Sequence, residues 1–223
     1  MKEKNKIQLS DHFTYGRMMR FTLPPIVMMI FTSIYGVVDG FFVSNFAGKT
    51  PFAAVNLTWP FLMILSTAGL MFGTGGSAIV ARAFSELYPG VEYVAQYVPD
   101  LRDETNGCFS LFVYITAAAG AGLAALGIVS IRPVAELLGG EGDMLENAVI
   151  YARIVLLALP FNVLQMLFQA FCTTAEKPRL GLLVTVASGV TNMALDAVLV
   201  ITLPQEYKLA GAAAATVAAQ GMM

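Results

Sequence analysis

The chain has 223 residues, of which 57% are hydrophobic and only 13% are charged, and its mean hydropathy is +0.70. A soluble domain usually carries about 25% charged residues, so this composition predicts a membrane protein and excludes an ordinary soluble domain. The net charge is −2, and the sequence has no basic stripe, so we expect no nucleic-acid partner.

Six apolar segments follow one another along the chain after a polar, basic arm over residues 1–20. A transmembrane helix needs about 20 apolar residues, and this length rule marks spans at residues 21–43, 53–81, 108–131, 148–172, 180–203 and 210–223. The last segment would make only about 21 Å of helix, so we expect the chain to end inside a span. The sequence therefore predicts an all-α, six-helix transmembrane bundle over residues 21–223 with no soluble domain.

The orientation follows from the basic residues, which are enriched on the cytoplasmic side of a membrane protein. With the N-terminus inside, the inner segments hold Lys2, Lys4, Lys6, Arg17, Arg20, Arg82, Arg102, Lys177 and Arg179, and the outer segments hold Lys49, Arg132, Arg153 and Lys208. We therefore expect a multi-pass protein of the plasma (inner) membrane, in contact with lipid, whose residues 1–20 are cytoplasmic. The inner loop over residues 85–105 is unusually long, and its role stays open.

Two acidic residues lie inside apolar segments, Asp39 in the first and Asp196 in the fifth. An acid at the centre of a span costs on the order of 2.5–3.5 kcal/mol on insertion scales, and such residues normally mark ion or proton pathways. At 1.5 Å per residue, Asp39 lies about 9 Å and Asp196 about 10 Å below the outer end of its helix. The two acids are therefore expected at one level of the bundle.

Neutral polar residues accompany the two acids. Thr216 in the sixth segment is expected at the same depth, Asn192 precedes Asp196 by one helical turn, and Tyr35 stands in the same relation to Asp39. Carboxylate, amide and hydroxyl oxygens suit a hard cation or a proton. The alternative is that each acid only makes a polar contact between helices.

The fourth segment carries Asn162, Gln165 and Gln169 at spacings of three and four, which place them on one helix face. They are candidates for lining a substrate cavity, and interhelical hydrogen bonding is an equal alternative. The single histidine, His12, excludes most catalytic triads and histidine metal sites. We expect neither an enzyme nor a cofactor, apart from a coupling sodium ion or proton.

Six segments, in order along the chain, give this sequence a resemblance to the multidrug and toxic compound extrusion (MATE) family. They are Pro24-Pro25 with residues 33–43 around Asp39, residues 53–56, residues 75–82, residues 170–178, the Asn192-x-x-x-Asp196 pattern, and residues 211–216. The resemblance covers nearly the whole chain. It implies one lobe of a fold of twelve helices in two six-helix lobes, so a C-terminal lobe is missing.

The resemblance also implies export of drugs and other xenobiotics, often amphipathic or cationic, driven by inward sodium or protons. The coupling site would comprise Asp39, Asn192, Asp196 and Thr216, with Tyr35 adjacent. Two alternatives stay open: an exporter that flips lipid-linked saccharides, and a non-transporting membrane subunit that needs a partner. The first usually needs basic residues in its cavity for phosphate, and no basic residue lies deep in any predicted span.

Overall fold

The computed structural model describes residues 14–87, 99–175 and 177–221, and every regular element within these ranges is helical. The elements are α1 (Tyr15–Phe42), η1 (Val43–Ala47, a π-helix), α2 (Lys49–Leu87), α3 (Pro99–Leu137), α4 (Gly142–Leu157), α5 (Leu159–Thr174), α6 (Pro178–Thr202), η2 (Gln205–Tyr207, a 3₁₀-helix) and α7 (Lys208–Gly221). The predicted all-α fold is confirmed.

In the described part of the chain, four stretches are long and apolar enough to cross a membrane individually: Met18–Ala47, Lys49–Ile79, Phe109–Leu137 and Pro178–Thr202. α4 and α5 meet the same criterion only as a pair, and α7 has 14 residues. The helices extend beyond several predicted spans, because hydropathy marks the apolar part of a helix while its backbone hydrogen bonds continue into polar residues. α1 thus begins at Tyr15 within the predicted arm, and α2 and α3 enter the predicted loop 85–105 from both sides. Residues 1–13 and 88–98 lie outside the described part of the chain.

The predicted span 148–172 corresponds to two helices, α4 and α5, that are bent by 50° relative to each other. Pro160 stands at the start of α5, and because proline has no backbone N–H it cannot donate the helical bond to the carbonyl four residues earlier. Ala158 instead closes a tighter turn, its N–H donating to the Val155 carbonyl at 3.0 Å. The bend allows α4 and α5 to follow different neighbours.

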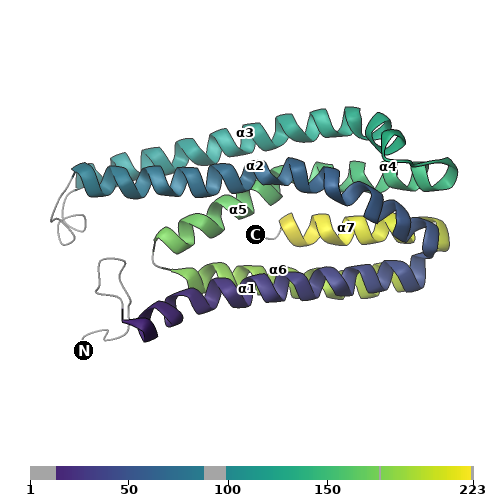
Figure 1. The fold of residues 1–223 in the computed structure, drawn as a ribbon, viewed down its shortest axis with the longest axis horizontal. Coiled ribbons are helices and arrows are strands. Elements are labelled where there is room, and N and C mark those ends of the chain that lie inside the picture. Colours follow the sequence, from purple (N-terminus) through teal and green to yellow (C-terminus); the bar gives the residue numbers. More distant parts are fainter. Residues whose placement is uncertain (1–13, 88–98, 176, 222–223) are drawn as a thin grey trace.

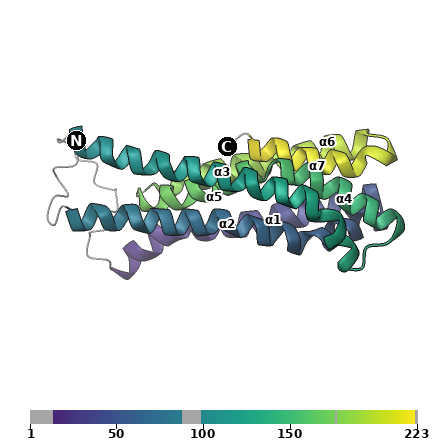
Figure 2. The same ribbon diagram turned by 90° about the horizontal axis from the view of Figure 1, so that it is seen from above.

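The helices form two groups. α2, α3, α4 and α5, here the scaffold group, pack on one another, while α1 packs chiefly on α6 and α6 on α7, here the site group. Figure 1 shows α1 beside α6 on one side of the molecule and α2 beside α3 on the other, with α5 and α7 between them. Figure 2 shows the same elongated bundle from above.

The buried core lies toward one end of this bundle. Its members come from η1 (Val43), the start of α2 (Val55), the end of α3 (Ile131), α4 (Leu156) and the start of α7 (Ala212). This end carries the α1–α2, α3–α4 and α6–α7 connections (Figure 1) and is called the hairpin end below. It corresponds to the outer side of the predicted topology.

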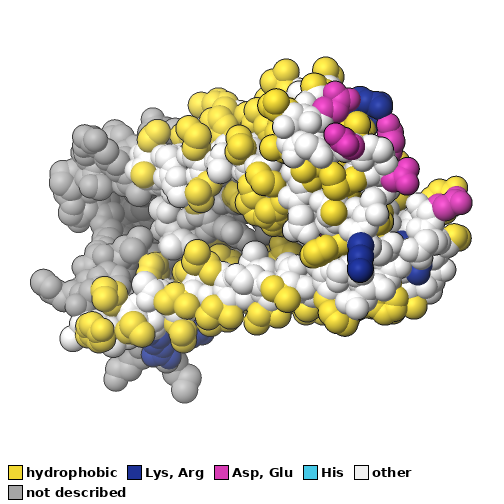
Figure 3. All heavy atoms as spheres, turned by 45° about the vertical axis from the view of Figure 1, so that its right-hand side comes forward, with side chains coloured by type: hydrophobic (Ala, Val, Ile, Leu, Met, Phe, Trp, Pro, Cys, Tyr) yellow, Lys and Arg dark blue, Asp and Glu magenta, His cyan; other side chains and the backbone are white. Residues whose placement is uncertain are grey.

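Charged side chains gather at the hairpin end, where Figure 3 shows acidic and basic groups beside a largely apolar flank. Arg132 pairs there with Glu146 at 2.6 Å, which joins α3 to α4, and with Glu136 of its own helix at 3.6 Å. Large apolar side chains are exposed along α1, including Met29 (71%) and Val37 (72%). An apolar flank with a charged end is the pattern of a helix bundle that lies in a bilayer.

Candidate functional site

The two acids of the predicted site face each other between α1 and α6. Asp196 is fully buried and Asp39 is partly buried, and their carboxyl groups are close enough to share a hydrogen bond when one of them is protonated. One oxygen of each, Oδ1, is buried without a hydrogen-bond partner. Buried polar atoms are normally paired, so these two oxygens indicate a place where a cation or a proton fits.

A glycine on α6 brings the two helices together. Gly189 precedes Asp196 by two turns, and a Cβ added there would lie 2.4 Å from the ring of Phe31 and 3.3 Å from the ring of Tyr35. Real Cβ atoms do not approach other atoms so closely, so only glycine permits this contact between α1 and α6. Tyr35 therefore lies at the same helix contact as Asp39, which follows it by one turn on α1.

Asn192 and Thr216 join α7 to the same cluster. The Asn192 amide nitrogen lies 3.4 Å from the Thr216 hydroxyl. With its amide turned by 180°, Asn192 donates from Nδ2 to Asp196 Oδ2 at 3.2 Å and accepts from the backbone N–H of Thr216 at 3.3 Å, which satisfies both ends of the amide. Ser188, one turn before Asn192 on α6, donates to the Ala219 carbonyl at 2.8 Å. In either orientation of the amide, two polar contacts, one from Asn192 and one from Ser188, align α6 with α7.

The structure adds Tyr151, which the sequence reasoning missed. Tyr151 lies on α4, is only 2% exposed, and is near enough to Asp39, Asp196 and Tyr35 to interact with their charges. A lone tyrosine in an apolar helix carries no signal of its own in the sequence. Its helix packs against α7. Four helices therefore contribute to the cluster.

The chemistry of this cluster is that of hard oxygen donors. Two carboxylates, an amide and hydroxyl groups converge, and no lysine or arginine among the described residues pairs with either acid. Within the same residues no group of three or more His, Cys, Asp or Glu side chains could hold a metal ion. Such a donor set fits sodium or a proton better than a transition metal.

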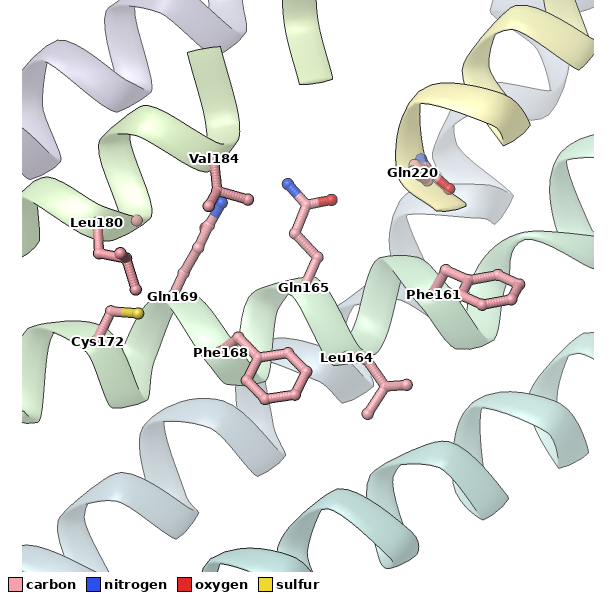
Figure 4. A pocket seen from close by; sticks show the side chains of 10 residues that line it. Phe161, Leu164, Gln165, Phe168, Gln169, Cys172, Leu180, Val184 and Gln220 are labelled. Atoms are coloured by element: carbon pink, nitrogen blue, oxygen red, sulfur yellow. The ribbon is translucent and has the colours of Figure 1, made fainter. Parts of the chain in front are cut away.

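The predicted cavity residues lie toward the other end of the bundle. A pocket of about 260 Å³ between α5 and α6 is lined by Phe161, Leu164, Gln165, Phe168, Gln169, Cys172, Leu180, Gly181, Val184 and Gln220. Figure 4 shows Gln165 and Gln169 projecting from α5 toward this space. Gln169 donates to the buried Thr185 hydroxyl at 2.9 Å. Asn162 is not among the lining residues, and its Oδ1 is buried without a partner.

The family model described as MatE matches residues 24–86 and 106–198, which is most of the chain and includes Asp39, Asn192 and Asp196. The chain belongs to the MatE family. The resemblance predicted from the sequence is therefore confirmed.

Curated relatives in this family share about a quarter of their residues with the chain. Multidrug export protein MepA of Staphylococcus saprophyticus is 24% identical over 200 residues, and that of Staphylococcus haemolyticus is 23% identical over 203 residues. These alignments cover 90% and 91% of this MatE chain but 42% of each relative. The chain thus spans less than half the length of these relatives, whose names are those of transporters and not of enzymes.

Solved structures show the same helix arrangement. Crystal structures of MATE in the bent and in the straight conformation match with TM-scores of 0.74 and 0.71, at 23% and 24% identity. Each alignment covers 91% of this MatE chain, and 42% or 41% of the solved chain. One lobe of a MATE transporter is therefore the fold of this chain.

Proposed function

We propose that this chain is one lobe of a cation-coupled exporter of amphipathic or cationic compounds, and that Asp39, Asn192, Asp196 and Thr216 hold the coupling ion. The observation that carries the proposal is the pair of facing carboxyl groups, each with a buried oxygen that has no partner. A sodium ion or a proton between them would satisfy both oxygens, whereas two bare carboxylates would repel each other.

Coupling requires that the ion favour one arrangement of the helices over another. Asp39 is on α1, and Asp196 is on α6, so an ion shared by both draws these helices together. Without the ion, repulsion between the carboxylates favours their separation. Tyr35 and Tyr151 border the same space and would adjust to either arrangement.

The pocket between α5 and α6 is the place where we expect part of a transported molecule to bind. Its apolar lining suits an amphipathic compound, and the amides of Gln165 and Gln169 offer hydrogen bonds. The names of the relatives support this substrate class, since they are called multidrug export proteins. The apolar flanks and the distribution of basic residues favour the plasma membrane with a cytoplasmic N-terminus.

The test is efflux of ethidium, an aromatic cation, from cells that make a two-lobe version in which a second lobe follows Met223. We expect Asp39→Asn and Asp196→Asn to abolish efflux driven by sodium or protons. Asp143→Asn, at an acid in the first turn of α4 at the hairpin end, should leave it unchanged. Coupled efflux that survives in both site variants would overturn the proposal.

The 223-residue chain by itself provides a second test. We expect no ethidium flux after its reconstitution in liposomes, because the relatives' second half would supply the other wall of the cavity. Robust flux would show that one lobe suffices. Flux of a lipid-linked saccharide in place of ethidium would favour the flippase alternative.

A further inference from the structure

The end of α1 that follows Asp39 has an unusual backbone. The α-helix widens into the π-helix η1 over Val43–Ala47, where the Gly48 N–H donates to the Val43 carbonyl at 3.1 Å across five residues. Gly48 then reverses the chain with φ +112°, a conformation that favours glycine. Because the last carbonyls of a helix have no partner within it, those at this end must bond elsewhere.

Two side chains from the α6–α7 connection supply these bonds. Gln205 donates from Nε2 to the Ala47 carbonyl at 2.7 Å, and Lys208 donates from Nζ to the Phe46 carbonyl at 3.2 Å. Ala47 is itself buried. The positive charge of Lys208 also matches the partial negative charge at a helix C-terminus. Gln205 and Lys208 are called the outer brace below.

The outer brace joins the same three helices that carry the coupling residues. Ala47 follows Asp39 by eight residues on the chain of α1 and η1, and Lys208 precedes Thr216 by eight residues on α7. Each distance is about 12 Å of helix. The two hydrogen bonds of the outer brace therefore fix the position of Asp39 along the bundle axis relative to Thr216 and to Asp196 on α6.

Apart from its contact with α6, α1 is held mainly at its outer end, through η1. Its remaining surface exposes large apolar side chains. The close contact at Gly189 sets the distance between α1 and α6, and the buried side chains of Val43 and Ala47 pack η1 into the core. The outer brace adds two directed hydrogen bonds at this end, which resist movement of α1 along its own axis because they are aimed at fixed carbonyl positions.

We propose that Gln205 and Lys208 are positioning residues for the coupling site: they hold the outer end of α1 so that Asp39 faces Asp196 and Asn192. The inference rests on the proposed function for the identity of the site. Neither residue touches the ion. Loss of the brace lowers the affinity for the ion while the site's own residues stay in place.

The experiment uses the 223-residue chain in lipid nanodiscs, with sodium as the probe. Dicyclohexylcarbodiimide modifies buried carboxyl groups, and mass spectrometry follows how sodium protects Asp39 and Asp196 from it. Hydrogen exchange of the amides of residues 43–48 reports on the brace independently of any ion. Gln205→Glu keeps the size of the side chain and removes its N–H donor. Lys208→Met keeps a long side chain and removes both the positive charge and the N–H donors.

We expect both variants to speed exchange in residues 43–48 and to raise the sodium concentration for half-protection on the order of fivefold, the value of one net hydrogen bond. The protection reached at saturating sodium should be the same as in the unmodified chain. Glu206→Gln, an exposed neighbour in η2, and Lys208→Arg, which keeps a donor, should leave exchange and midpoint unchanged. If protons are the coupling ion, the same comparison uses the pH at which labelling is half-maximal in place of the sodium concentration.

An unchanged sodium concentration for half-protection in Gln205→Glu and Lys208→Met would overturn the positioning role of the outer brace. Unchanged hydrogen exchange in residues 43–48 would overturn it as well. A different result would count against the proposed function: no dependence of labelling on sodium or pH in the unmodified chain. In that case the rate at which Asp39 is labelled tests whether Gln205 positions Asp39. An equal rate in Gln205→Glu and in the unmodified chain would overturn this positioning role, and a changed rate would support it.

Discussion

Glycines allow close helix contacts in both groups, but in the site group these contacts are accompanied by buried polar side chains that bond from one helix to the next. A Cβ added to Gly69 would lie 2.6 Å from the Cα of Val163, so α2 touches the backbone of α5. α6 and α7, in contrast, are joined by the hydrogen bonds of Ser188 and Asn192. Close apolar packing gives a fixed frame. Polar contacts can exchange partners, which suits the part of the lobe that responds to an ion.

The two groups also differ in the kind of buried polar atom that has no partner. In the scaffold group these atoms are neutral oxygens, Thr116 Oγ1 and Asn162 Oδ1, while in the site group Asp39 and Asp196 each keep an unpaired carboxylate oxygen. Gln169 donates to Thr185 where α5 of the one group meets α6 of the other. A paired amide stabilises the contact between the groups. An unpaired carboxylate oxygen requires a ligand. The following predictions test this division from the largest expected effect to the smallest.

Gly69→Val should do the most damage, because the new side chain would collide with the backbone of α5. We expect a loss of stability of more than about 3 kcal/mol, the upper end of overpacking costs, and little monodisperse protein on size-exclusion chromatography. Gly75→Val is the matched control on α2, since a Cβ there meets nothing within 4 Å. Equal yields of the two variants would remove the distinction between a rigid frame and a responsive group.

Asp196→Asn should abolish the response of the chain to its ion while leaving the fold intact. A ligand at a concentration of 100 times its Kd stabilises a protein by about 2.7 kcal/mol, and this gain should vanish. Thermal unfolding in nanodiscs with and without sodium, and across pH, measures it. Asp143→Asn should keep the full response. A response that persists in Asp196→Asn would place the ion site outside the site group.

Tyr151→Phe tests whether the scaffold group contributes to the site. The change keeps the buried ring and removes only the hydroxyl, so we expect the sodium concentration for half-maximal stabilisation to rise on the order of fivefold, as for one lost hydrogen bond. Tyr207→Phe, at an exposed tyrosine of η2, is the control. If both variants behave like the unmodified chain, the site belongs to α1, α6 and α7 alone.

Gln169→Met should have the smallest effect. It removes the bond to Thr185, and interhelical hydrogen bonds in membrane proteins contribute about 0.6 kcal/mol on average. Denaturant titration in mixed micelles should show a loss of that size and an unchanged response to sodium. Gln165→Met, in the same pocket but without the bond to Thr185, should be closer to neutral. A lost sodium response in Gln169→Met would mean that the two sets of polar residues act as one.

The residues of the candidate site could be named from the sequence because an acid in an apolar segment is conspicuous and the rise per residue of a helix is constant. That arithmetic placed Asp39, Asp196 and Thr216 at one depth, and in the structure Asp39 faces Asp196 while Asn192 links Asp196 to Thr216. The same reasoning grouped Asn162 with Gln165 and Gln169. It could not tell which part of a helix face meets an opening and which meets a neighbouring helix.

Sequence alone determined the membrane character, the all-α fold, the family and the level of the acids, because these follow from hydropathy, helix periodicity and motifs local to each segment. Tertiary structure alone decided that α4 brings Tyr151 to the site. It also decided that Gln205 reaches the end of α1. Both contacts join residues far apart in the chain, and their partners are set by how helices pack, which no single segment encodes.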